Sequence, residues 1–122
     1  MKEISRAPVI QSCYEANTII QRLAAGYPAN YRHTLGMRLA MSAIDLLTEL
    51  LKTNASSDYA MRSSALLELR TKLFILCMEL RLGKDLELIP KRQHAAIHEH
   101  LVGIRKQISG WLKWTERQRK PA

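Results

Sequence analysis

The sequence is poor in cysteine and in large aromatic residues. Its 122 residues include two cysteines, one phenylalanine and two tryptophans. Cys13 and Cys77 lie far apart, a spacing that matches neither a zinc knuckle nor a CxxC redox motif, and each falls within an apolar stretch. We therefore expect buried free thiols in a reducing compartment rather than a disulfide.

Long apolar runs and targeting segments are also missing. No apolar run approaches the roughly 20 residues that a helix needs to cross a bilayer. Residues 1–6 lead into no apolar signal-peptide core. The sequence predicts a soluble, cytoplasmic protein with no membrane partner.

Motifs that carry catalytic chemistry are absent as well. There is no GxSxG nucleophile elbow, no glycine-rich phosphate loop before a helix, and no Glu-x-x-His pair of the kind that di-iron bundles use. His94 and His98 stand one helical turn apart, as two metal ligands could, but Ala95 occupies the position where a metalloprotease carries its glutamate. We expect no catalytic residue, no cofactor and no metal site. A metal-dependent enzyme that uses His94 and His98 stays open as an alternative.

Apolar residues at helical spacing dominate what is present. The stretch 66–83 carries leucines three and four residues apart, on one helix face: Leu66, Leu69, Leu73, Leu76 and Leu80. We expect four neighbours to widen this apolar face, namely Leu67, Phe74, Cys77 and Met78. A face this broad predicts a core helix with apolar partners on more than one side, and Gly83 is expected to end it in a left-handed conformation.

Three other segments repeat the same spacing. With the leucine-rich segment they predict helices at about residues 9–26, 31–54, 57–82 and 90–116, joined by short connections and followed by a basic C-terminal tail. Nothing alternates with a period of two for long enough to indicate a sheet. The predicted fold is all-α, a single domain over residues 1–122 that forms an antiparallel up-down-up-down four-helix bundle.

Several local features refine this prediction. Asn30 is expected to cap the second helix, and Ser56 or Ser57 the third. Gly103 and Gly110 lie two turns apart in the last helix, where a glycine is unfavourable, so we expect another helix to approach closely there. The second helix carries an additional apolar stripe formed by Met37, Met41, Ile44 and Leu51. If this stripe is uncovered within one chain, it predicts an oligomer contact.

Positive charge is concentrated near the C-terminus. The formal charge is +8, and residues 84–122 hold nine Lys or Arg against four Asp or Glu, which gives +5 of that total. On the last helix Arg92, Lys106, Lys113 and Lys120 are separated by multiples of seven, with Arg117 close by and Arg105 adjacent. Such a ladder of cations suits a phosphate backbone, and Glu99 interrupts it. An acidic partner, or an ordinary solvated helix face, is an alternative interpretation.

Few aromatic residues are available to stack on unpaired bases. The candidates are Tyr31, Tyr59 and Trp114. Binding to nucleic acid is therefore expected to depend on phosphate contacts, with little readout of sequence.

Three short motifs resemble a known family. Tyr27-Pro28, the LRLG of residues 80–83 and above all the IRKQISGW of residues 104–111 resemble the bundle proteins that include the accessory variability determinants of diversity-generating retroelements. Similar bundle proteins are encoded within intervening sequences of bacterial large-subunit ribosomal RNA genes. The resemblance extends from about Tyr14 to Trp114.

The resemblance implies a function and an assembly. Proteins of this family form rings of five bundles with a basic surface and bind nucleic acid and the reverse transcriptase of the same element. They support error-prone copying of a template RNA, after which the mutated cDNA replaces part of a target gene. They have no known catalytic residues of their own. Arg81, Arg105 and Lys106 match basic positions of the family, and Gly110 and Trp111 match as packing residues. The alternative within the resemblance is an RNA-associated bundle from a ribosomal intervening sequence, without a polymerase partner.

Overall fold

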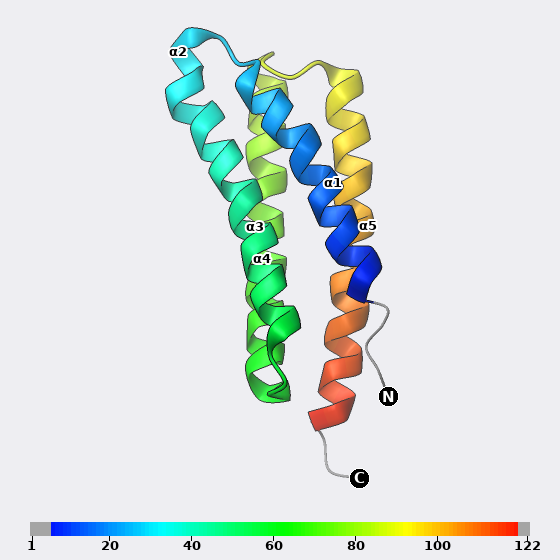
Figure 1. The fold of residues 1–122 in the computed structure, drawn as a ribbon. Helices are drawn as coiled ribbons and strands as arrows, with labels where there is room; N and C mark the ends of the chain where they lie inside the picture. Colours follow the sequence, from blue (N-terminus) through cyan, green and yellow to red (C-terminus); the bar gives the residue numbers. More distant parts are fainter. Residues whose placement is uncertain (1–5, 120–122) are drawn as a thin grey trace.

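Four long helices account for most of the residues described by the structure, a computed structural model that covers residues 6–119 (Figure 1). The long helices are α1 (Arg6–Ala25), α3 (Met37–Ala55), α4 (Tyr59–Asp85) and α5 (Lys91–Arg119). A single turn, α2 (Ala29–Tyr31), and a π-helical segment, η1 (Arg32–Gly36), lead into α3. Residues 6–119 contain no strand, so the predicted all-helical class is confirmed.

The helices pack in a closed cycle around one apolar core. α1 contacts α3 and α5, and α4 contacts the same two helices. In Figure 1 the α1–α3 and α4–α5 connections lie at one end of the molecule, and the α3–α4 connection lies at the other. The leucine face of α4 is buried at Leu66, Leu69, Leu73, Leu76 and Leu80, as predicted. Each helix therefore turns one face inward and leaves the opposite face to solvent.

Tyr27, in the connection between α1 and α2, belongs to this core. Its side chain is almost completely buried, and it lies against two glycines of other helical segments, Gly36 and Gly83. A Cβ at Gly36 would lie 3.3 Å from the Tyr27 ring, and one at Gly83 would collide with the Tyr27 hydroxyl. Glycine at these positions lets three segments approach the same aromatic ring.

Gly83 does not end its helix, contrary to the prediction. α4 continues through Gly83 to Asp85, and no glycine in residues 6–119 has a positive φ. The left-handed conformation is instead found at Glu87, with φ of 61°. Gly83 is needed for close packing, because a Cβ there would lie 2.9 Å from Ile89 Cδ1 as well as against Tyr27.

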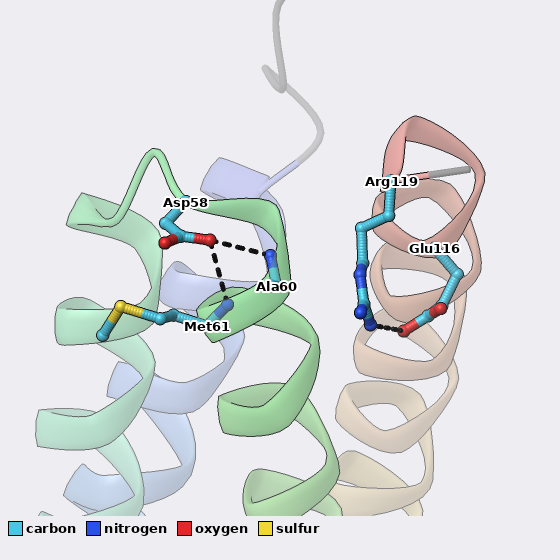
Figure 2. A network of polar contacts seen from close by, with 5 residues as sticks. All are labelled: Asp58, Ala60, Met61, Glu116 and Arg119. Carbon is cyan, nitrogen blue, oxygen red and sulfur yellow. Dashed lines mark hydrogen bonds and ion pairs between the residues drawn. The ribbon is translucent and has the colours of Figure 1, made fainter. Parts of the chain in front are cut away.

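The caps also differ from those predicted. Asn30 lies inside α2, and the residue before that turn, Pro28, provides no side-chain cap. α4 is capped by Asp58, whose Oδ1 accepts hydrogen bonds from the amides of Ala60 and Met61 at 2.9 and 3.2 Å (Figure 2). Ser56 Oγ accepts a hydrogen bond from the Asp58 amide instead of capping the helix directly.

Two packing predictions are wrong. Apart from the neighbouring backbone of α5 itself, no atom of the described residues lies within 4 Å of a Cβ built at Gly103 or Gly110, so no other described helix approaches either glycine closely. Leu67, Phe74 and Met78 are exposed, so they do not widen the core face of α4, whereas the half-buried Cys77 packs against the core as predicted. The physical reason is that the buried face of α4 is centred on the leucine stripe, and the three exposed residues lie more than a quarter turn beyond it.

Two further predictions concern the cysteines, which we expected to be buried free thiols, and the lack of a helix that could cross a membrane. Both cysteines are free, Cys13 being buried and Cys77 half-buried. Within residues 6–119, no helix is long and apolar enough to cross a membrane.

We predict that Gly83→Ala lowers the free energy of unfolding by about 1–3 kcal/mol, the usual size of overpacking effects. The added methyl group would meet Tyr27 and Ile89, both of which are buried too tightly to move freely. Gly110→Ala is the matched control, because it also lies within a helix but in open space. It should raise stability by about 0.5–1 kcal/mol. Equal effects of the two substitutions in urea unfolding would contradict this packing.

Neighbouring residues of α4 give a second prediction. Leu73→Ala should lower the free energy of unfolding by about 2–5 kcal/mol, because Leu73 is buried in the core. Phe74→Ala should change it by less than about 0.5 kcal/mol, as expected for a surface position. Thermal and chemical unfolding followed by circular dichroism measure both. A large loss for Phe74→Ala would mean that this side chain is covered.

Candidate nucleic-acid interface

The outer face of α5 carries a row of cations. Burial of Ile97, Ile104 and Ile108 fixes which side of α5 faces the core. The opposite side presents four exposed cations: Arg92, Lys106, Lys113 and Arg117. These four are named the α5 outer face from here on. Since a helix rises about 1.5 Å per residue, the row spans roughly 38 Å.

Carboxylates neutralise only a small part of the positive charge of this row. None of the ion pairs found in the described part of the chain involves a residue of the α5 outer face. Glu99 is exposed and interrupts the row, as predicted. Glu116 is engaged by Arg119 at 3.3 Å, in the last turn of the helix (Figure 2). The outer face therefore keeps a net positive field toward solvent.

An aromatic cluster holds the C-terminal half of α5 against the start of α4. The Tyr59 and Trp114 rings meet edge to face, with centroids 5.9 Å apart. The buried Arg62 guanidinium lies 5.2 Å from the Tyr59 ring centre and 5.8 Å from that of Trp111, and it donates a hydrogen bond to the Ser56 carbonyl. Cation–π contacts at a desolvated site are favourable, so this cluster fixes the part of α5 that carries Lys113 and Arg117.

Arg105 and Arg81 lie on a different surface from the outer face. Arg105 and Lys106 are adjacent in sequence, but successive residues of a helix are turned by about 100°, which directs Arg105 toward α4. Both Arg105 and Arg81 line a groove between α4 and α5, together with Arg70. The predicted cations thus belong to two surfaces that meet at Arg105 and Lys106. Lys120 lies outside the described residues.

The groove between α4 and α5 has an apolar floor and a cationic rim. Its volume is about 240 Å³. The floor is formed by Leu73, Phe74, Cys77, Met78, Leu101 and Val102, and the remaining lining residues are Arg70, Arg81, Arg105, His94 and His98. Arg81 is paired with Asp85 at 3.8 Å, whereas none of the ion pairs found within the described residues involves Arg70 or Arg105. We call this feature the α4/α5 groove.

The ionisable groups of the groove respond to burial and to the surrounding cations. Burial lowers the pKa of His94, and the charge of Lys84 and the neighbouring His98 lower it further. Burial raises the pKa of the Cys77 thiol, and the positive charge of Arg105 partly offsets this rise. Thiolate chemistry at Cys77 is therefore disfavoured at neutral pH.

His94 and His98 lie parallel to each other rather than around a common ligand position. Their rings are stacked with centroids 6.0 Å apart. Within the described residues, no group of three His, Cys, Asp or Glu side chains is arranged to hold a metal ion. Burial raises the pKa of the other cysteine, Cys13, to about 11, so it is a poor nucleophile at neutral pH.

Sequence reasoning missed Phe74 as an exposed aromatic residue. Its side chain is 64% exposed and lines the α4/α5 groove. The residues proposed instead for base stacking are engaged elsewhere, since Tyr59 contacts Trp114, and Tyr31 and Trp114 pack against the core. The sequence did contain one indication of this site. Arg70 and Phe74 are four residues apart, which puts both on one side of α4.

Comparison with known proteins does not assign a function to these surfaces. A scan against protein-family models finds no match to the chain, and a search of curated proteins finds no significant relative.

The environment of His94 yields a testable pKa. We predict that His94 titrates below 6.5 and that Lys84→Met raises its pKa, because one of the charges that oppose protonation is removed. Lys91→Met, a charge removal on α5 itself, should have little effect. Two-dimensional NMR of the imidazole protons against pH measures both variants.

The lowered pKa of His94 also makes stability depend on pH. The unfolded chain binds the imidazole proton more tightly than the folded chain, so His94 lowers stability as the pH falls below 6.5.

Proposed function

We propose that this chain is a non-catalytic accessory protein of a diversity-generating retroelement. In this role it binds template RNA or cDNA and the reverse transcriptase of the same element in the cytoplasm, and it supports mutagenic retrohoming. The observation that carries the nucleic-acid part is the α5 outer face, an exposed row of cations without ion-pair partners among the described residues. The retroelement assignment is supported by the LRLG and IRKQISGW motifs.

The family motifs lie at positions that shape this molecule. Gly83 of LRLG packs against Tyr27, and Trp111 of IRKQISGW is buried beside Arg62. Arg81, Arg105 and Lys106, the matched basic positions, are all exposed. The motifs therefore combine residues that maintain the bundle with residues that are available to a polyanion.

We further propose an antiparallel up-down-up-down bundle that assembles into a homopentamer. The alternation of the connections between the two ends of the molecule supports the topology (Figure 1). The apolar stripe of α3 supports self-association, because its four residues, Met37, Met41, Ile44 and Leu51, are each about half exposed, at 47–55%. Exposed apolar residues that share one helix face are typical of a surface that another subunit covers.

The alternative is an RNA-associated bundle encoded in a ribosomal intervening sequence. It shares the α5 outer face and the expectation of RNA binding but has no reverse transcriptase partner. Sequencing the DNA on both sides of the gene separates the two. A neighbouring reverse transcriptase gene and a near-duplicate segment that differs at adenines support the retroelement, whereas ribosomal RNA flanks support the alternative.

Charge reversal tests the nucleic-acid surface. We predict that Arg105→Glu with Lys106→Glu abolishes binding to nucleic acid at moderate salt and leaves the helicity intact, because both side chains are exposed. Lys106→Glu with Lys113→Glu, which alters the α5 outer face alone, should weaken binding at least about tenfold. It should also reduce the slope of log K against log salt by about 1–2. Fluorescence anisotropy with labelled RNA gives both quantities.

A matched control separates site from net charge. Arg22→Glu with Lys52→Glu makes the same change in net charge on α1 and α3, at two exposed positions. It should lower affinity far less than the α5 variants. Equal losses would assign binding to overall charge, and a flat salt dependence of the wild type would exclude a phosphate-led mode.

A further inference from the structure

We propose that the α4/α5 groove binds an unpaired nucleotide of a single-stranded nucleic acid. Its base stacks on Phe74, and the flanking phosphates are held by Arg70 and Arg105. This inference rests on the proposed function, in which the chain binds nucleic acid, and adds a specific subsite for single strands.

The exposure of Phe74 is the first observation. A phenylalanine that is 64% exposed leaves most of its ring in water, although several core positions on the same helix are fully buried. The ring borders the α4/α5 groove and also a second, more open hollow that Leu67 and Thr71 line. The ring therefore offers exposed surface at both hollows, and a base needs only one exposed ring face to stack on.

The cations beside the ring are the second observation. Arg70 and Arg105 line both of the hollows that Phe74 borders, so two arginines from different helices share these hollows with the aromatic ring. None of the ion pairs found in the described part of the chain engages either of them. Guanidinium groups bind phosphate through paired hydrogen bonds and also stack on flat rings, so both can contact a nucleotide.

The floor of the groove is the third observation. Met78, Leu101 and Val102 form an apolar surface beside Phe74, and Arg81 and His94 line the same groove. A nucleotide combines a flat apolar base with an anionic phosphate, which matches an apolar floor inside a cationic rim. The positive charge of the rim therefore favours an anionic occupant. Asp85 leaves this charge largely in place, because among the described residues it pairs with Arg81 and not with Arg70 or Arg105.

The position of the groove connects it to the α5 outer face. Arg105 belongs to the groove and Lys106 to the outer face, so a single strand that contacts both passes from one surface to the other. A base inside a duplex is already stacked and cannot enter the groove. The outer face should therefore serve single strands and duplexes alike, whereas the groove serves single strands.

Phe74→Ala tests the inference directly. We predict that it lowers the affinity for a labelled single-stranded RNA without self-complementarity by about five- to 150-fold, the usual effect of losing one stacked base. Its affinity for the corresponding duplex RNA should stay within about twofold. Phe74→Trp should restore single-strand affinity, because the larger ring also stacks. Ile75→Ala is the matched control, an exposed apolar truncation one residue along that lines neither hollow.

A spectroscopic signal identifies stacking independently of affinity. A single strand carrying 2-aminopurine should lose fluorescence on binding the wild type and Phe74→Trp, and keep it with Phe74→Ala. Equal losses of single-strand and duplex affinity in Phe74→Ala would overturn the inference. So would unchanged affinity for both.

Experiments on the same variant can also show that a second copy of the chain or a protein partner occupies the groove. Sedimentation of Phe74→Ala shows whether the assembly changes; dissociation would mean that a second copy covers the groove and would overturn the inference. Displacement of the RNA by an acidic amphipathic helical peptide, without any single-strand preference in the wild type, would assign the groove to a protein partner. Failure of the proposed function looks different, because Lys106→Glu with Lys113→Glu would then leave both affinities unchanged.

Discussion

Tyr27 packs against Gly36 and Gly83, which brings the end of α4 and the segment before α3 close to the same buried side chain. Because Gly83 has no side chain, the Tyr27 ring reaches the end of α4, and the Gly83 carbonyl accepts hydrogen bonds from the amides of Leu88 and Ile89 at 2.7 and 3.2 Å. These bonds close the turn that leads from α4 toward α5.

The spacing of the leucines in α4 was enough to predict a helical fold. Features that this spacing does not determine were not predicted. Leucine spacing in α4 identified the buried face correctly, because burial selects apolar residues at every turn. The same pattern could not show where the face ends, so Phe74 and Met78 were assigned to the core although they face solvent. Gly83 was read from local conformational preference, whereas its role depends on a tertiary contact with Tyr27 that no local pattern contains.

The candidate site was predictable to a similar degree. Heptad spacing on α5 found the row of exposed cations, because spacing alone determines which residues share a helix face. It could not assign Arg105 and Lys106 to different surfaces, since that requires the position of α4. Nor could it find the combination of Arg70, Phe74 and Arg105, which comes from two helices. In the proposed function, the α5 outer face contacts the phosphate backbone and the groove takes an unpaired base.

In the proposed function, nucleic acid binds along α5 and the adjoining groove. Backbone amide chemical shifts recorded during titration with a short single-stranded RNA test it most directly. We expect shift changes concentrated on α5 and on the groove side of α4, with the exposed positions of α1 and the α3 stripe unaffected. Changes confined to α3, or no changes at concentrations where RNA-binding proteins saturate, would contradict it.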